Sequence, residues 1–420
     1  MREMKDSGIE WIGDIPVYWK IMPNKYLMRK EKKICPVYHG EDILSLTMKG
    51  VIVRDLDAGG KMPASFDGYQ RLEAGNLLMC LFDIDVTPRC VGLIKQAGVS
   101  SPAYSQFVLR KGADAAYYCY YYTMLDNDKT LLHLAKNLRH SLTEDQLGAI
   151  PVIVPPIEEQ QRIADFLDAK CAEIDALTAD IQTQIDTLEQ YKRSVITETV
   201  TKGLNLNAEM KDSGIEWVGE IPAHWLVHPV YYYYGERKNK NYLGKEDNLL
   251  SLSYGRVVRK DINTSDGLLP ESFNTYNIVE TGDIIIRPTD LQNDKRSLRT
   301  GLVKEHGIIT SAYIDLCPIK QVDSRYFYFL LHAYDVMKVF YNMGNGVRQG
   351  LNYSEFSRLM VFEPPYDEQV AMADYLEAKV EEVDVVISDK KAQLATLDEY
   401  KKSLIFEYVT GKKEVSEGAD

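Results

Sequence analysis

The chain has 420 residues, of which 45% are hydrophobic and 26% charged, and its formal net charge is −13. This length exceeds one ordinary core and predicts two or three domains, while the composition excludes a wholly disordered chain. No apolar run reaches the ~20 residues of a membrane span, and the opening MREMKDSGIE lacks the apolar core of a signal peptide. The six cysteines form no CxxC pair, which is typical of a reducing compartment. We therefore expect a cytoplasmic protein with no metal site, and the acidic total argues against a nucleic-acid partner.

The sequence repeats itself, beginning with its first segment. KDSGIEWIGDIPVYW at 5–19 returns at 211–225 as KDSGIEWVGEIPAHW, identical at 11 of 15 positions. PPIEEQQRIADFLDAK at 155–170 returns at 364–379 as PPYDEQVAMADYLEAK, whereas the interiors, roughly 85–140 and 291–350, barely align. The pattern predicts a tandem duplication in which two similar frames carry different interiors. Surface drift of a duplicated domain is the alternative.

Short β-rich stretches bounded by Gly, Pro, Asn or Asp fill the first part of each copy, for example 50–55 and 282–288. A tyrosine-rich stretch with a helical pattern follows, at 116–125 and 325–334. Tyrosines can stack on bases, but matching positions in both copies favour the core, and the same holds for the tyrosine run 231–234.

Each copy closes with a long predicted helix. Pro-Pro followed by two acidic residues is a helix-start signal, and apolar residues then recur at alternating three- and four-residue spacing without an internal Pro or Gly. Such a pattern predicts a coiled coil of about 65 to 70 Å in which the two helices pair antiparallel. Packing of each helix on its own domain or on another protein is the alternative. The predicted seam consists of Leu167, Ile174, Ile181, Ile185, Leu188, Val195, Leu376, Val380, Val383, Ile387, Leu394, Leu397 and Leu404.

The expected fold class is α+β: two β-rich α/β domains separated by a pair of long antiparallel coiled-coil helices, in a pseudo-twofold tandem repeat. The expected boundaries are 1–154 for the first domain, 155–203 for the first helix, 204–363 for the second domain, 364–413 for the second helix and 414–420 for a disordered acidic tail.

Catalytic signatures are largely missing from the sequence. It contains no GxxxxGK[ST] loop and no HExxH, and the histidines form no metal or triad arrangement. EPPY at 363–366 resembles the [DN]PP[YF] motif of amino-methyltransferases, but Glu363 replaces the Asn or Asp and no Gly-rich cofactor loop precedes it. We therefore expect neither catalytic residues nor a cofactor.

The duplicated parts together resemble the specificity (S) subunits of type I restriction-modification systems, the HsdS family. The resemblance rests on the paired SGIEWIGDIP and SGIEWVGEIP openings, the paired PPIEEQ and PPYDEQ helix starts, GVRQGL (346–351), and the helix ends VTKG (200–203) and VTGK (409–412). It implies that each globular unit is a target recognition domain for one half of a bipartite double-stranded DNA site. It also implies that the helices act as spacer and dock two modification (methyltransferase) subunits. Restriction subunits would join through the complex, and this chain would not itself be an enzyme.

DNA contacts are expected from Arg, Lys, Asn and Gln in the dissimilar interiors, because these side chains bind guanine, adenine or phosphate. For any one of them, a solvated surface charge is an equally good interpretation. The candidates are Arg54, Lys61, Arg89, Lys95, Gln96, Arg139, Arg287, Gln292, Asn293, Lys295, Arg296, Arg299, Lys304 and Arg348.

Two other functions fit parts of the pattern: a coiled-coil adaptor that bridges two partner proteins without touching DNA, and a single-chain methyltransferase with a fused target domain. The charge distribution bears on the first. Residues 155–203 carry 10 acidic and 5 basic side chains, and 364–420 carry 14 and 7, whereas 1–154 carry 18 and 19 and 204–363 carry 20 and 18. The helices hold nearly all the negative excess, so DNA is excluded from them but not from the domains. We expect weak DNA binding by the chain alone.

The sequence generates one direct test of the basic cluster in the second interior. Alanine at both Arg296 and Arg299 should weaken specific DNA binding by the assembled methyltransferase, because two cations near the base edges or phosphates are lost. Unchanged affinity for the cognate site in a gel-shift titration would contradict this placement.

Overall fold

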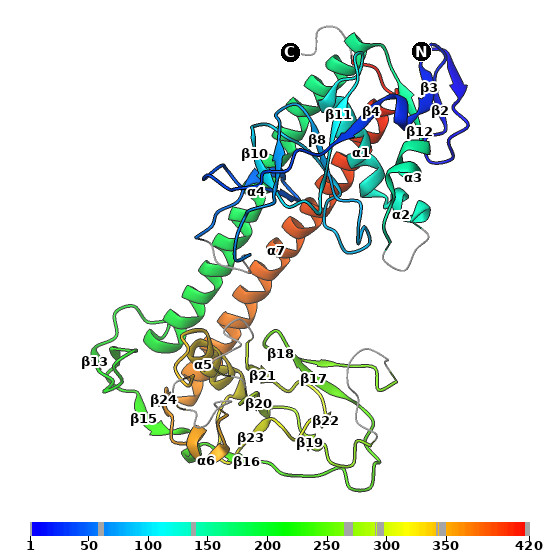
Figure 1. Ribbon diagram of the computed structural model, residues 1–420. Helices are drawn as coiled ribbons and strands as arrows, with labels where there is room; N and C mark the ends of the chain where they lie inside the picture. The colour runs from blue at the N-terminus through cyan, green and yellow to red at the C-terminus, as the bar shows by residue number, and fades with distance from the viewer. Residues whose placement is uncertain are drawn as a thin grey trace. The chain divides into compact units, whose positions relative to one another are not determined.

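The computed structural model describes residues 2–57, 63–135, 140–263, 272–289, 291, 298–341, 343 and 350–415. It is a mixed α/β structure that divides into two compact units, Met1–Ile181 with Lys391–Asp420, and Gln182–Lys390 (Figure 1). These units cut across the expected boundaries, since each contains one half of each long helix. The reason is packing: each helix half lies against the globular part of its own unit.

A four-stranded antiparallel sheet of order β4-β11-β8-β9 forms the centre of the first unit. Two-stranded antiparallel ladders β1-β2, β3-β12, β5-β6 and β7-β10 surround it. In chain order the strands and helices are β1 (Met4–Asp6), β2 (Asp14–Pro16), β3 (Lys20–Pro23), η1 (Asn24–Tyr26), β4 (Met28–Glu31), β5 (Leu44–Thr47), β6 (Gly50–Val53), β7 (Gln70–Leu72), β8 (Leu77–Met79), β9 (Val91–Leu93), β10 (Gly98–Ser100), β11 (Ser105–Leu109), α1 (Ala115–Asn127), α2 (Thr130–Leu134), α3 (Glu144–Ala149), β12 (Pro151–Val154) and α4 (Ile157–Lys202).

The second unit repeats this order, with a central sheet β16-β23-β20-β21 and ladders β13-β14, β15-β24, β17-β18 and β19-β22. Its elements are β13 (Met210–Asp212), β14 (Glu220–Pro222), β15 (Leu226–Pro229), η2 (Val230–Tyr232), β16 (Tyr234–Glu236), β17 (Leu250–Ser253), β18 (Arg256–Arg259), β19 (Asn277–Val279), β20 (Ile284–Ile286), β21 (Thr300–Leu302), β22 (Gly307–Ile309), β23 (Ile314–Pro318), α5 (Ser324–Val336), α6 (Tyr353–Phe356), β24 (Met360–Glu363) and α7 (Tyr366–Val409). The strands therefore correspond one to one even in the interiors, where the sequences barely align.

Glycines at matching positions explain how this correspondence survives sequence divergence. A Cβ on Gly92 would lie 2.8 Å from the side chains of Leu46 and Val51, and a Cβ on Gly301 would lie 2.5 Å from Leu252. The β5-β6 and β17-β18 hairpins thus pack directly on β9 and β21, at a separation that only glycine permits.

A tryptophan–glutamate hydrogen bond joins each opening segment to the start of a long helix. Trp19 Nε1 donates to Glu159 Oε2 at 2.9 Å, and Trp225 Nε1 donates to Glu368 Oε2 at 3.0 Å. Both indole rings are fully buried. The paired sequence motifs at 5–19 and 155–170 are therefore two sides of one contact, found again in the second unit.

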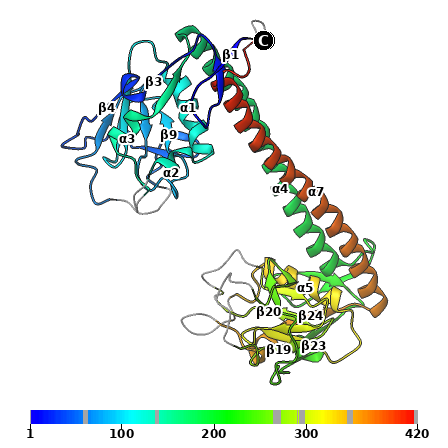
Figure 2. The same ribbon diagram turned by 90° about the vertical axis from the view of Figure 1, so that its right-hand side faces the viewer.

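The long helices contact each other within each unit. In the first, the rings of Phe166 and Tyr408 lie 4.4 Å apart, and Lys401 Nζ donates to Asp175 Oδ1 at 2.6 Å. In the second, Lys192 Nζ donates to Asp384 Oδ1 at 2.7 Å. The first part of α4 thus packs on the last part of α7, and the last part of α4 on the first part of α7 (Figure 2).

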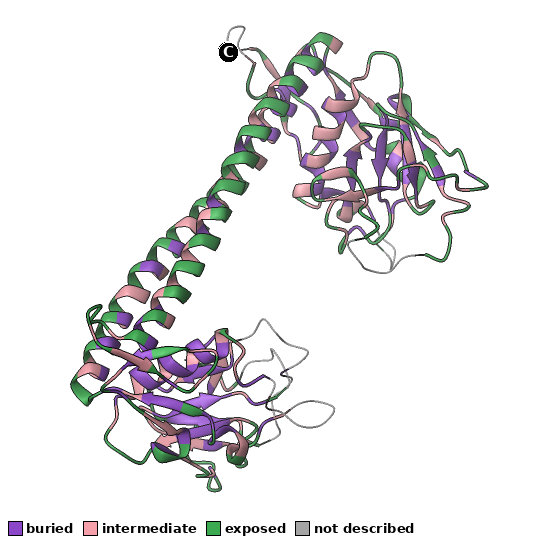
Figure 3. Cartoon of the chain, turned by 90° about the vertical axis from the view of Figure 1, so that its left-hand side faces the viewer, coloured by how far each residue is buried: buried purple, intermediate pink, exposed green. Residues whose placement is uncertain are grey.

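The predicted seam residues lie on the packed sides of both helices, visible as purple and pink bands (Figure 3). The buried ones are Leu167, Ile174, Ile181, Ile185, Leu376, Val383, Ile387 and Leu404. The half-buried ones are Leu188, Val195, Val380, Leu394 and Leu397.

The prediction of a tyrosine core is confirmed for the helices that follow each central sheet and half wrong for the run 231–234. In α1 the fully buried rings are Tyr117, Tyr118, Tyr121 and Tyr122, and in α5 they are Tyr326 and Tyr334. Tyr233 and Tyr234 are buried too, but Tyr231 and Tyr232 are 54% and 38% exposed. Both exposed residues belong to η2, a single surface turn that points their side chains outward.

The cores differ at one matched pair of positions on the central sheets. In the first unit Asn76 Nδ2 donates to Gln106 Oε1 at 3.3 Å. In the second, Asp283 and Asp315 occupy these positions, both 1% exposed, and Arg237 Nε lies 2.8 Å from Asp283 and 3.8 Å from Asp315. Burial, with the neighbouring charge of Asp283, raises the pKa of Asp315 to about 8, against the lowering effect of Arg237.

This acid pair predicts a pH dependence of stability. An unfolded aspartate has a pKa of about 4, so the folded chain holds an extra proton on Asp315 between about pH 4 and pH 8, and stability falls as pH rises through that window. Asp315→Asn removes the ionisable group and with it this fall in stability at high pH. The substitution should therefore raise the thermal midpoint of the second unit more at pH 9 than at pH 5, and calorimetry measures both midpoints.

The converse variant Gln106→Glu places a carboxyl at the matching position of the first unit. It should make the stability of the first unit fall as pH rises. Equal effects of Asp315→Asn at pH 5 and pH 9 would contradict the assignment of the proton.

Candidate nucleic-acid interface

A buried aspartate near the end of the helix that follows each central sheet organises the basic residues around it. Asp126 of α1 accepts the backbone N–H of Cys90 at 3.0 Å, and Asp335 of α5 accepts the backbone N–H of Arg299. The two aspartates are 3% and 0% exposed. Each joins its helix to the start of β9 or β21, and each needs a compensating positive charge nearby because it is removed from water.

Arg89 supplies such a charge in the first unit. Its Nη1 lies 3.4 Å from Asp126 Oδ2 and donates to Asn127 Oδ1 at 2.8 Å, while Lys129 Nζ lies 2.9 Å from Asp126 Oδ1. The Arg89 side chain is only 16% exposed. It is therefore mainly a partner of Asp126, and only its outer edge reaches solvent.

Arg299 corrects the sequence-based interpretation, because the structure buries it completely. Its Nε donates to the hydroxyl of Tyr341 at 3.0 Å, its Nη1 donates to the backbone oxygen of Thr289, and Tyr341 donates to Asp335 Oδ1 at 2.9 Å. Burial raises the pKa of Asp335, and the charge of Arg299 works against this rise. Arg299 holds the β20–β21 connection onto α5 and is not available to DNA.

Lys95 and Lys304 occupy matching, exposed positions on the turns β9–β10 and β21–β22. Beside Lys95, Gln96 Nε2 donates to Asp42 Oδ2 at 2.7 Å. Beside Lys304, His306 contacts Glu246 and Glu280 at 2.9 and 2.8 Å, and the hydrogen bond to Glu280 raises the pKa of His306. The second turn is therefore surrounded by carboxylates, which makes it the less favourable of the two for phosphate.

Arg54 and Arg287 are half-buried and follow directly on β6 and β20. Their backbone N–H groups donate to Ile43 and Arg299 oxygens at 2.7 and 2.8 Å. The remaining candidates, Lys61, Arg139, Gln292, Asn293, Lys295, Arg296 and Arg348, lie outside the described residues.

The β17-β18 hairpin carries exposed residues that the sequence analysis did not select. Tyr254 at its turn is 89% exposed, and the side chains of Arg256 and Arg259 are 66% and 69% exposed. The aromatic ring of Tyr254 and the exposed guanidinium group of Arg259 suit contacts with nucleic acid, whereas Arg256 forms an ion pair with Asp384. The alternation in LSLSYGRVVR (250–259) around a Tyr-Gly turn is a hairpin signal that would have located them.

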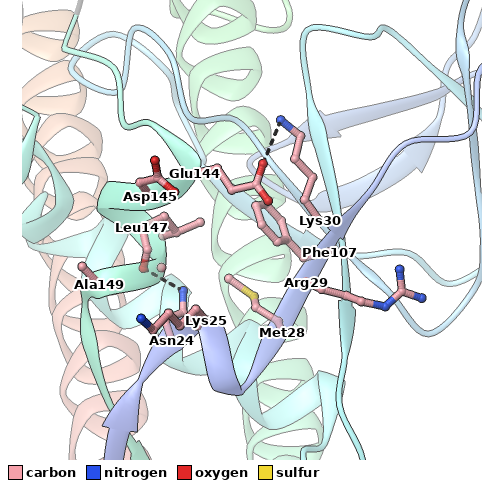
Figure 4. A pocket seen from close by; sticks show the side chains of 11 residues that line it. Asn24, Lys25, Met28, Arg29, Lys30, Phe107, Glu144, Asp145, Leu147 and Ala149 are labelled. Carbon is pink, nitrogen blue, oxygen red and sulfur yellow. Dashed lines mark hydrogen bonds and ion pairs between the residues drawn. The ribbon is translucent and has the colours of Figure 1, made fainter.

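A shallow cavity of about 300 Å³ opens between η1, β4 and α3 of the first unit (Figure 4). Lys30 faces Glu144 across it at 3.9 Å, and Asn24 Nδ2 donates to the backbone oxygen of Leu147 at 3.1 Å, while Arg29 points away. Charges of both signs line the cavity, which suits a polar contact surface better than an anion site.

Within the described ranges no cluster of His, Cys, Asp and Glu side chains is placed to hold a metal ion. None of the described helices combines the length and the apolar character that crossing a bilayer requires.

Residues 91–187 match the family model of the type I restriction modification DNA specificity domain. Two curated relatives come from Methanocaldococcus jannaschii. The putative type I restriction enzyme MjaX specificity subunit is 24% identical over 278 residues, and the type I restriction enzyme MjaVIII specificity subunit is 25% identical over 285. These alignments cover 65% and 63% of this chain and 61% and 62% of the relatives, so the chain spans about three fifths of their length.

A solved chain from a study of complex assembly and conformational transition in a type I R-M system covers 95% of this chain and 99% of its own length, with a TM-score of 0.70 and 11% identity. This likeness concerns the fold. This chain is therefore similar to the type I restriction-modification specificity subunits over residues 91–187 and in these two partial alignments.

The position of Arg299 predicts a stability effect in place of a binding effect. Arg299→Ala should lower the free energy of unfolding by on the order of 3 kcal/mol, because it removes a buried cation and leaves Asp335 and Tyr341 without that partner. Lys304→Ala, at an exposed position, should change it by less than about 0.5 kcal/mol. Chemical denaturation followed by circular dichroism measures both, and a stable Arg299→Ala protein would refute the structural role.

Proposed function

We propose that this chain is the DNA sequence-recognition subunit of a type I restriction-modification complex, and that it has no catalytic role of its own. Each unit recognises one half of a bipartite double-stranded site, and the paired helices set the distance between the halves and dock two methyltransferase subunits. The observation that carries the proposal is the one-to-one recurrence of the strands in both units, around interiors whose side chains differ. Equal frames suit two identical partners, and unequal interiors suit two different half-sites.

The helices offer a matched pair of surfaces for such partners. In the first unit Lys170 pairs with Glu173 at 2.9 Å beside Tyr400, which is 55% exposed. In the second, Lys379 pairs with Glu382 at 2.7 Å, and its ammonium lies 6.0 Å from the ring centre of Tyr191, which is 45% exposed. We call these the Tyr400 and Tyr191 patches.

An exposed tyrosine beside a salt bridge is the composition of a protein-binding surface, since aromatic side chains often dominate binding energy. The acidic excess of the helices also suits a protein partner better than phosphate. The restriction subunits would then join the complex through the methyltransferases.

The two patches predict a stepwise loss of partners. When the chain is co-expressed with a methyltransferase subunit, Tyr191→Ala and Tyr400→Ala should each reduce the bound subunits from two to one, and the double variant should bind none. Each substitution removes a contact residue from one patch only. Native mass spectrometry counts the subunits, and Tyr242→Ala, at an exposed turn position outside the helices, is the control. Retention of two subunits by the double variant would reject the patches.

A footprint separates this function from the adaptor alternative. The complex of this chain with methyltransferase should protect two short DNA segments separated by an unprotected spacer. An adaptor would form the same protein complex without any footprint on host DNA, and that result would overturn the proposed function.

A further inference from the structure

The β17-β18 hairpin of the second unit is joined to both long helices through one carboxylate. Arg256, the first residue of β18, forms an ion pair with Asp384 of α7, and Lys192 of α4 lies 2.7 Å from the same side chain. Asp384 is 21% exposed and Lys192 is 18% exposed, whereas Arg256 is 66% exposed. The hairpin therefore reaches over to a carboxylate already held between the helices.

A second contact fixes the turn of the same hairpin. The hydroxyl of Tyr328, on α5, donates to the backbone oxygen of Gly255 at 3.1 Å. Burial raises the pKa of Tyr328 to about 12, so the hydroxyl keeps its proton and remains a donor at neutral pH. Arg256 and Gly255 are adjacent in the sequence. The turn of the hairpin is therefore fixed to α7 through Arg256 and to α5 through Gly255.

The first unit has the same helix contact but lacks both hairpin contacts. Lys401 Nζ lies 2.6 Å from Asp175 Oδ1, the counterpart of the Lys192–Asp384 pair. Gly50, which has no side chain, stands in the place of Arg256, and Cys119 stands in the place of Tyr328. The Asp175 side chain is 63% exposed, three times the value for Asp384. The connection between hairpin and helices is thus a property of the second unit.

An exposed ion pair contributes little to the free energy of folding, so stability does not account for this arrangement. It does restrict where the hairpin can lie, and the same hairpin carries the exposed side chains of Tyr254 and Arg259. We propose that Arg256 is a positioning residue: it fixes the β17-β18 hairpin on the helix pair, so that the second half-site is accepted at one spacing only. This role rests on the proposed DNA-recognition function.

Hydrogen exchange of the full-length chain tests the connection without DNA. Arg256→Ala and Asp384→Asn should both accelerate amide exchange in residues 250–259, because the hairpin loses its contact with the helices. Asp175→Asn is the matched control: it breaks the equivalent Lys401 pair and should leave exchange in residues 44–53 unchanged. Unchanged exchange at 250–259 in both test variants would overturn the proposal.

Spacer discrimination tests the consequence. The probes are duplexes carrying the bipartite site obtained by mapping methylated adenines in the host, with the spacer unchanged or altered by one base pair. With the assembled methyltransferase complex, Arg256→Ala should reduce the affinity ratio between correct and altered spacers by about two- to fivefold, the range for one exposed ion pair. Arg256→Lys should preserve most of the ratio, and Asp175→Asn all of it.

Faster exchange with an unchanged spacer ratio would leave Arg256 a purely structural contact and overturn its positioning role. If the wild-type complex binds none of the duplexes specifically, the proposed function itself fails, and the positioning role fails with it. A reduced ratio in Arg256→Ala and Asp384→Asn but not in Asp175→Asn supports the inference.

Discussion

Burial of the apolar seam between α4 and α7 is the constraint on which the rest of the structure depends. Helices of 46 and 44 residues cannot leave such a seam in water, and each unit buries its share by packing half of one helix on half of the other. Lys192 and Lys401 interrupt the seam at matching positions and pair with Asp384 and Asp175. These side chains are part-exposed, from 18% for Lys192 to 63% for Asp175, so a shifted register would lose the two ion pairs and the observed register is modestly favoured.

The globular parts are fixed to these helices by equivalent contacts, and their charges are largely committed to internal roles. In the first turn of each long helix a glutamate carboxylate accepts a hydrogen bond from a buried tryptophan: Glu159 from Trp19 and Glu368 from Trp225. Asp126 and Asp335 draw nearby cations toward the core. A count of basic residues in an interior therefore overstates the positive charge available to a polyanion, since part of that charge neutralises buried aspartate.

The frame could be predicted from the sequence because its signals are local and periodic. Heptads, proline and acidic residues at helix starts, and the recurrence of KDSGIEW located both helices and both openings. Individual surface residues could not be predicted in this way. Whether the Arg299 side chain faces solvent or Tyr341 depends on where α5 packs. The contact between Arg299 and Asp335 of α5 joins residues 36 positions apart in the sequence, and composition carries no information about it. The predicted burial of Tyr231 and Tyr232 was wrong for a similar reason, because the single turn of η2 determines which rings of the run face outward.

The two units share one order of strands but differ at particular side chains. Packing fixes Gly92 and Gly301, the Trp–Glu pairs and the seam, because any change there creates a clash or an unpaired polar group. Positions 50 and 256, and positions 106 and 315, differ between the units, although the surrounding strands pair in the same order. At those positions the second unit has an arginine that pairs with Asp384 and a buried acid whose pKa burial raises, where the first unit has glycine and glutamine. The two units therefore carry different side chains at these positions on one shared arrangement of strands.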